Sequence, residues 1–279
     1  MKGFWKIEFR RLIRSIGFWT AMIIYLVICI LQYRDITLPA VKYMDMIINK
    51  LDNIKIGTLY PHSAYNHWIG GDLESYWHYI YFMLIPIIAV IPYSYTYNYD
   101  RKSKLIVNYY IRADRKDYVI VKYIITFLAG AVTVIIPLAC NLALTMMKLP
   151  AITPQSSTGT YPVNGSDMFA DLFYTKPLVY LLVYFVIIFI YSGIMAVLPL
   201  SISFWTDNTF VQLSTPFIGN LLVYCVCNTK NMYKYVPMRF TDPAQDGGFT
   251  DAFTAVFILI VLLVFNVLSV KRGIMDETL

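Results

Sequence analysis

The sequence predicts an all-α, polytopic membrane protein with six transmembrane helices, and three observations lead to this fold class. Only 14% of the 279 residues are charged, whereas a soluble domain usually carries about 25%. Hydrophobic residues make up 58% of the chain, and the mean hydropathy is +0.57. The charges also leave six long uncharged stretches between them. A soluble enzyme, a disordered chain and a nucleic-acid-binding protein are therefore excluded, despite the net charge of +6.

Each uncharged stretch is long enough to cross a bilayer as a helix. A helix needs about 20 mostly apolar residues to span a hydrocarbon core of ~30 Å. Lipid offers no partners for backbone polar groups, so such a run forms a helix, and the short alternating pattern of a membrane β-barrel is missing. In a single domain of residues 1–279, the expected spans are about 17–33, 79–98, 120–147, 177–202, 208–228 and 252–270.

The basic residues predict the orientation. With six spans, both termini and the segment around 100–122 lie on one side, and that side carries 14 of the 23 Lys and Arg residues. Basic residues are enriched on the cytoplasmic side of membrane proteins. We therefore expect a multi-pass protein of the cytoplasmic (plasma) membrane with both termini in the cytoplasm. The first apolar block is expected to be retained, because no small-residue cleavage site follows it.

Residues 1–16 form a basic amphipathic pattern. Lys2, Lys6, Arg10 and Arg14 recur every four residues and make one stripe on a helix. Such a helix suits the inner membrane surface. It is either a general anchor attracted to anionic lipid or an element with a specific structural role. Its membrane-interface residues are expected to be Trp5, Phe9, Arg10, Arg11 and Arg14.

The expected outer loops differ in character. Apolar residues at helical spacing over 38–51 predict an amphipathic helix that lies on the outer membrane surface or caps the bundle. Proline and glycine punctuate 149–175, which predicts an irregular loop. They also punctuate 229–250, which suits either a broken, lid-like structure or an ordinary loop.

Nothing in the sequence points to catalysis or metal binding. His62, His67 and His78 lack the spacing of a helical metal site, and the usual hydrolase, zinc-protease and nucleotide-binding motifs are missing. The four cysteines all fall in apolar blocks, where we expect small buried side chains rather than disulfides. The chain is predicted not to be an enzyme and to hold no cofactor.

The segment 99–118, between the second and third spans, combines apolar and basic residues. So many large apolar groups in a short connector indicate a surface that contacts a cytoplasmic partner; the alternative is a short helix buried against the membrane or the bundle. The candidate contact residues are Leu105, Ile106, Tyr109, Tyr110, Ile111, Arg112 and Arg115.

The apolar blocks predict a bundle interior without ionisable side chains. Ion-coupled carriers usually place such groups inside the membrane, so their absence disfavours a carrier. Polar residues in the blocks (Asn141, Thr145, Asn220 and Asn266) are expected to bond across helices rather than line a pathway. The tyrosines at 93, 95, 97 and 99 predict an aromatic belt at the inner interface rather than a pathway surface.

Taken together, the layout resembles the permeases of type-2 ABC exporters. The resemblance rests on the amphipathic start Phe4-Trp-Lys-Ile-Glu-Phe-Arg-Arg-Leu-Ile-Arg14, on the six spans, and on Arg115-Lys-Asp-Tyr-Val-Ile-Val-Lys122 before the third span. Asp100 is similar to an acidic residue that precedes the coupling helix of that family. The Gly-Thr pair common after this acid is replaced by Lys102-Ser103. The resemblance covers the whole chain in layout, with few motifs.

The resemblance implies a function and partners. The chain would be one half of a homo- or heterodimeric permease whose cytoplasmic coupling helix, within 99–118, docks on a separate ATPase subunit that binds ATP and Mg²⁺. Segment 229–250 would match the short external or re-entrant helices of the family. The uncharged lining suits a hydrophobic or amphipathic cargo, such as a bacteriocin-like or lantibiotic peptide or a lipophilic drug. The alternatives are a six-span secondary carrier or channel, and a membrane sensor or scaffold without transport.

Overall fold

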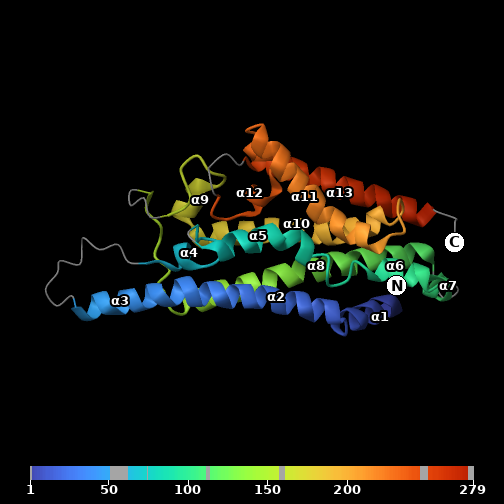
Figure 1. The fold of residues 1–279 in the computed structure, drawn as a ribbon, viewed down its shortest axis with the longest axis horizontal. Coiled ribbons are helices and arrows are strands. Elements are labelled where there is room, and N and C mark those ends of the chain that lie inside the picture. The colour runs from blue at the N-terminus through green and yellow to red at the C-terminus, as the bar shows by residue number, and fades with distance from the viewer. Residues whose placement is uncertain are drawn as a thin grey trace.

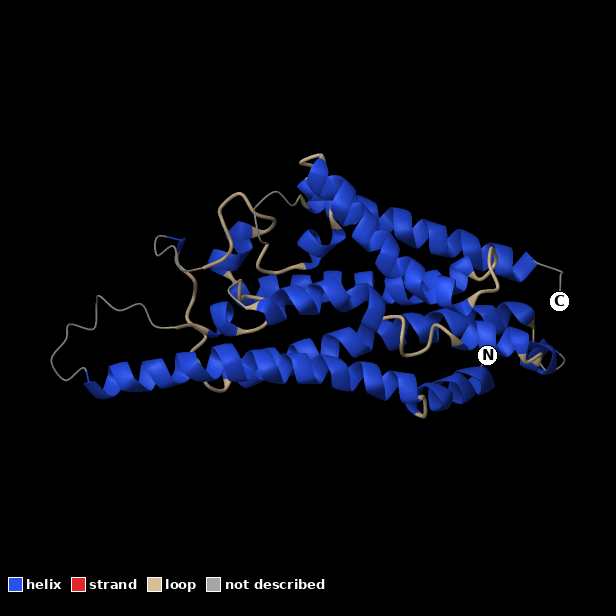
Figure 2. Ribbon diagram, viewed as in Figure 1, coloured by secondary structure: helices blue, strands red, loops and turns tan. Residues whose placement is uncertain are grey.

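The computed structural model describes residues 2–50, 62–73, 75–110, 114–156, 161–245 and 251–275. Helix accounts for 77% of the structure, and the described residues form no strands (Figure 2). The all-α fold class is therefore confirmed.

Five helices in the described chain are long and apolar enough to cross a membrane. They are the continuous helix Ile16–Met46, α8 (Arg115–Met146), α10 (Pro177–Ile202), α11 (Thr209–Thr229) and α13 (Ala252–Met275). These helices identify the chain as a membrane protein by length and composition.

The predicted second span, 79–98, has a different form from the other five. The apolar helix α5 (Tyr76–Ile88) ends before a run of turns, and a short helix α6 (Thr96–Lys102) follows. Pro92 lies in these turns, and a proline cannot donate the backbone hydrogen bond that would continue the helix. The turns pack closely on small residues: a Cβ on Gly17 would lie 2.6 Å from the Ile91 carbonyl oxygen, and one on Gly130 would lie 2.7 Å from that of Ala89.

The first long helix corrects the expectation for residues 38–51. α2 (Ile16–Gln32) continues through a π-helical turn, η1 (Tyr33–Thr37), into α3 (Leu38–Lys50). The three segments lie end to end in Figure 1. The amphipathic stretch therefore extends the first span as one rod instead of turning onto a membrane surface. Pro39 lies in the first turn of α3, directly after the π-helical turn, where a proline is tolerated. Residue 51 lies outside the described chain.

α8 and α10 form the centre of the bundle. Within their most apolar windows, 61% and 56% of the residues are buried, against 17% in α11 and 28% in α13. The core is rich in aromatic residues, and Tyr25 stacks on Tyr81 with ring centroids 4.2 Å apart. α11 and α13 leave their large apolar side chains exposed on the periphery, as lipid-facing helices do.

The cysteines depart from the sequence-based expectation. Cys29 is buried, but Cys140 and Cys225 are exposed and Cys227 is half-buried. Helix periodicity turns these three side chains away from the core, although the surrounding sequence is apolar. They form no disulfide.

The short helices gather at the two ends of the bundle (Figure 1). α1 (Lys2–Ile13), α6, α7 (Leu105–Tyr110) and the last turns of α13 lie at one end, which we call the α1 end. α3, α4 (Ala64–His67) and α9 (Ala170–Thr175) lie at the other, which we call the α3 end. The segment 229–245 contains η4 (Tyr233–Tyr235) and α12 (Pro237–Thr241), and residues 246–250 lie outside the described chain.

Candidate functional site

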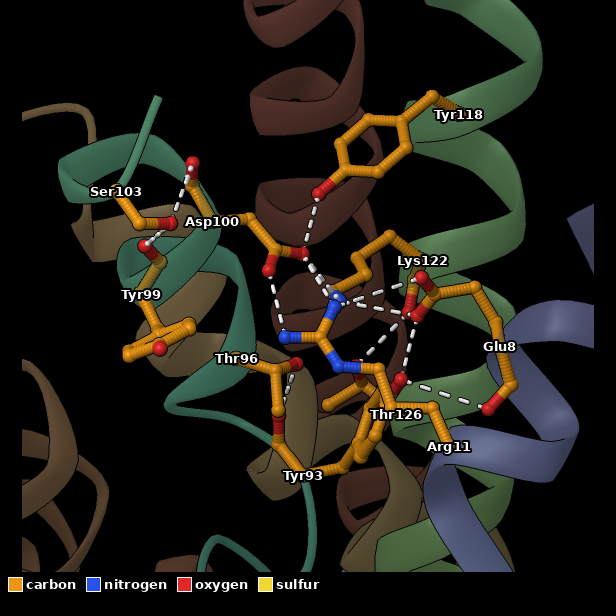
Figure 3. A network of polar contacts seen from close by, with 10 residues as sticks. All are labelled: Glu8, Arg11, Tyr93, Thr96, Tyr99, Asp100, Ser103, Tyr118, Lys122 and Thr126. Atoms are coloured by element: carbon orange, nitrogen blue, oxygen red, sulfur yellow. Dashed lines mark hydrogen bonds and ion pairs between the residues drawn. The ribbon is translucent and has the colours of Figure 1, made fainter. Parts of the chain in front are cut away.

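Four charged side chains meet inside the α1 end, where α1, α6 and α8 converge (Figure 3). Glu8 and Arg11 come from α1, Asp100 from α6 and Lys122 from α8. Glu8 and Arg11 are three residues apart and therefore lie on one face of α1. The buried Leu12 lies on the same face. Packing that face inward therefore carries both charges into the bundle. We call these four residues the ion network.

Asp100 is the acceptor at its centre. Its Oδ1 accepts a hydrogen bond from Arg11 Nη2 at 2.6 Å, and its Oδ2 accepts one from Arg11 Nη1 at 2.9 Å. The same Oδ2 accepts from Lys122 Nζ and from the Tyr118 hydroxyl, each at 2.8 Å. A paired Arg–carboxylate contact is directional as well as strong. Asp100 thereby fixes α6 to α1 and α8.

Lys122 bridges the two carboxylates. Its Nζ lies 2.8 Å from Asp100 Oδ2 and 2.9 Å from Glu8 Oε2, and 4.8 Å from the centre of the Tyr93 ring. The Tyr93 hydroxyl also donates to Glu8 Oε2. Glu8, Asp100 and Lys122 are at most 1% exposed. Two carboxylates and two cations balance, which is the condition under which charges are tolerated in an interior.

The network shifts the acidity of its members. Burial alone would raise the pKa of Asp100, but the hydrogen bonds from Arg11 and the charge of Lys122 together hold it below its usual value. Burial opposes the charge on Arg11, and the hydrogen bond to Asp100 outweighs it, so the pKa of Arg11 is raised. Both side chains therefore stay ionised at neutral pH.

Local sequence patterns predict only part of this network. The resemblance points to Asp100 and includes Lys122 only as the end of the stretch before the third span, and no pattern assigns a role to Glu8. The expectation of an interior without ionisable side chains is wrong, because Glu8, Asp100 and Lys122 are buried. A usable signal was present: Lys122 is a lone cation within the apolar run Tyr118–Ile125, about two turns inside α8.

The candidate contact residues on α7 divide between inward and outward positions. Ile106 is 1% exposed and packs with Tyr97, Tyr118 and Leu200, and Tyr109 stacks on Tyr118 at 5.3 Å. Leu105 is exposed, as is its neighbour Val107.

Of the other predicted contact residues, the structure describes the side chain of Arg115 alone. Arg115 begins α8 and is half-buried. The Tyr110 side chain, Ile111 and Arg112 lie outside the described residues.

The residues predicted at the membrane interface lie on α1 and in the turn that follows it. Phe9, Arg10 and Arg14 are exposed, Trp5 is half-buried, and Arg11 is 27% exposed while it binds Asp100. α1 thus has a structural contact with the bundle through Arg11 and Glu8. The specific role that the sequence left open is supported by that contact.

The tyrosine run does not form a uniform belt. Tyr95 and Tyr99 are exposed, whereas Tyr93 and Tyr97 are at most 2% exposed and pack inside the α1 end. The turns at 89–95 and the helix α6 alternate these side chains between surface and core. The belt prediction is therefore wrong for Tyr93 and Tyr97.

A second polar cluster lies toward the α3 end and combines amide side chains with one buried histidine–aspartate pair. Asn141 donates to Gln32 Oε1 at 2.9 Å and accepts from the Ile69 backbone at 2.9 Å. His78 Nε2 lies 2.9 Å from Asp242 Oδ2, and its Nδ1 lies 2.6 Å from the Ile69 carbonyl. These contacts hold the segments around Ile69 and Asp242 against the helices.

The interhelical role expected for the polar block residues is confirmed for three of the four. Asn141 bonds to α2, Asn220 accepts from Tyr191 on α10, and Asn266 accepts from Ser201 on α10. Thr145 bonds within its own helix, to the Asn141 carbonyl.

No protein-family model, curated protein or solved structure matches the chain. The described residues also contain no group of three His, Cys, Asp or Glu side chains placed to hold a metal ion.

Proposed function

We propose that the chain is the transmembrane permease subunit of an ATP-driven ABC exporter in the cytoplasmic membrane. A separate ATPase and a second permease half complete the transporter, which moves a hydrophobic or amphipathic compound, such as a bacteriocin-like peptide or a lipophilic drug. In this proposal, α5, the turns and the start of α6, up to about residue 98, make the second of six spans. The α1 end faces the cytoplasm, because the basic residues are concentrated there.

The ion network carries the proposal. A permease driven from outside needs a rigid connection between the ATPase contact and the helices that move. α6 leads directly into α7, and Asp100 of α6 is bonded to Arg11 of α1 and to Lys122 of the central helix α8. A displacement of α7 would therefore reach three elements through short, buried, charged contacts.

α7 supplies both an outer and an inner surface for this role. Leu105 and Val107 are exposed and form the proposed ATPase contact, with Ile111, Arg112 and Arg115 nearby in sequence. Ile106 and Tyr109 face the bundle, where they pack with Tyr118. Leu105 and Val107 would contact the ATPase. Ile106 and Tyr109 would transmit the resulting movement of α7 to α8.

The test is copurification from the native host. Full-length chain extracted in mild detergent is expected to retain a stoichiometric ATP-hydrolysing subunit, measured by quantitative mass spectrometry and ATP turnover. The double variant Leu105→Asp/Val107→Asp should retain about tenfold less, because charge in an apolar contact is costly. Tyr43→Asp/Met46→Asp, two exposed sites on α3, is the matched control and should retain it. A wild-type chain without an ATPase contradicts the proposal.

One observation favours a secondary carrier as the second candidate. Carriers use buried ionisable groups to bind coupling ions, and the ion network provides Glu8, Asp100 and Lys122. Reconstituted chain alone would then move its substrate in response to a proton or sodium gradient. If transport requires ATP and the second subunit and does not depend on the gradient, the carrier is excluded. If the chain binds an ATPase but transports nothing, a scaffold is supported.

A further inference from the structure

A basic pocket lies between α1 and the segment 93–99. Its volume is about 810 Å³, and its lining includes Lys6, Arg10, Arg11, Arg14, Tyr95 and Tyr99. Pockets of this size accommodate small organic ligands. Lys6, Arg10 and Arg14 follow one another at four-residue spacing, which brings them to one side of the helix and the turn after it.

The positive charge of the pocket is largely uncompensated. Among the described residues, no carboxylate lines it, and Lys6, Arg10 and Arg14 form no ion pair there. Arg11 alone is paired, with Asp100. Three cations are the donors that a phosphate group needs.

An apolar stripe begins at the rim of this pocket. Ile16 belongs to the lining and is 81% exposed. Ile23 and Ile30 follow at intervals of seven residues on α2 and are 55% and 57% exposed, so the three share one face. Such an apolar stripe offers no favourable contact to a water-soluble anion, but an acyl chain can pack along it.

We propose that the pocket binds the phosphate of one anionic phospholipid, whose acyl chains lie along the Ile16–Ile23–Ile30 face of α2. Lys6, Arg10 and Arg14 contact the phosphate, and Tyr99 donates at the edge of the headgroup. The site requires only that the chain is inserted in a membrane, so it stands independently of the ABC assignment. A zwitterionic lipid carries a cation that the three basic residues repel.

The test measures lipid retention by the full-length chain. Protein delipidated in detergent is titrated with phosphatidylglycerol or phosphatidylcholine, and bound lipid is counted by native mass spectrometry. We expect about one phosphatidylglycerol per chain and at least tenfold weaker binding of phosphatidylcholine. Lys6→Gln/Arg10→Gln/Arg14→Gln should lose about tenfold in affinity for phosphatidylglycerol, which corresponds to about 1.4 kcal/mol.

A matched control separates the site from general charge. Lys104→Gln/Lys116→Gln/Lys271→Gln removes the same charge from exposed positions outside the pocket and should bind phosphatidylglycerol within twofold of wild type. Equal losses in the two triple variants overturn the proposal. Arg14→Gln alone, in the exposed turn after α1, should weaken binding about threefold and provides the test if the triple variant does not fold.

Two further measurements test whether the pocket binds a soluble phosphate or a protein instead of a lipid. Glycerol 3-phosphate and inorganic phosphate at millimolar concentration should leave the lipid bound; displacement by either one assigns the pocket to a soluble phosphate and overturns the lipid site. If the pocket triple variant loses a copurifying protein but keeps its phosphatidylglycerol, the pocket is a protein contact, and the lipid site is again overturned.

Discussion

At the α1 end four charged side chains join three helices, whereas toward the α3 end amides, histidines and the single His78–Asp242 pair make the contacts. Lys122 bonds to carboxylates that lie far away in sequence, while Asn141 and Gln32 bond to each other, to backbone groups and to Asp72. Charged contacts are worth more when complete and cost more when one partner is lost. The two ends should therefore differ in how they respond to mutation and to pH.

The largest effect is expected when the network loses its bridging cation. Lys122→Met leaves Glu8 and Asp100 buried with less compensation, which should lower the free energy of unfolding by about 3–5 kcal/mol. Thermal unfolding in detergent, followed by light scattering or a thiol-independent dye, measures the loss. Lys116→Met, exposed on the same helix, is the control and should change little. Equal melting temperatures for the two variants would show that the network is not stabilising.

A smaller loss is expected from Asp100→Asn. The amide can accept from Arg11 but carries no charge, so we expect a loss of about 2 kcal/mol at neutral pH. The lowered pKa of Asp100 means that this advantage of the wild type is fully present above about pH 4, the ordinary pKa of a free aspartate. It is lost as the pH falls through the lower value of the folded protein.

The melting difference between wild type and Asp100→Asn, measured from pH 7 to pH 3, checks this expectation. It should be constant down to about pH 4 and shrink below that. A difference that disappears near pH 6 would mean that another group controls it.

The α3 end should respond to pH earlier. His67 Nε2 lies 2.6 Å from His62 Nδ1, and burial, together with the charge of His62, lowers the pKa of His67 to about 4. The unfolded chain takes up this proton at about pH 6.5, so stability falls as the pH drops from about 6.5 toward 4, by about 2 kcal/mol after allowance for solvent screening. His67→Gln should flatten this part of the stability profile; an unchanged profile would remove His67 as its cause.

A smaller effect again is expected from Asn141→Ala. The change removes bonds to Gln32, the Cys29 carbonyl and the Ile69 backbone, yet hydrogen bonds between membrane helices average well under 1 kcal/mol each. We expect a loss of about 1 kcal/mol by thermal unfolding. Asn220→Ala, which removes one bond to Tyr191, should cost less. If Asn141→Ala costs as much as Lys122→Met, the two ends are equally dependent on their polar contacts.

The sequence predicts this fold where residues act through local pattern. α10 occupies Pro177–Ile202, the range expected from its uncharged run. The turns after α5 depend on close packing against Gly17 and Gly130, which are distant in sequence. A hydropathy pattern cannot report such contacts, so the second span was expected to be continuous.

The ion network, too, is predictable from the sequence only where residues act through local pattern. Asp100 could be singled out because the charge stands beside a resemblance motif, and α1 because its basic stripe is regular. The pairing of Glu8 with Lys122 joins residues from opposite ends of the first half of the chain. Their burial follows from the packing of α1 on α8, which no local pattern contains.

The continuous first helix has a consequence for the shape of the protein outside the bilayer. Ile16–Met46 has 31 residues, so at 1.5 Å per residue it is about 46 Å long. A hydrocarbon core of ~30 Å leaves several turns standing clear of the membrane on the side opposite α1. Tyr43 and Met46 are exposed on this stalk. The length of this helix therefore sets how far the protein extends beyond the hydrocarbon core on that side.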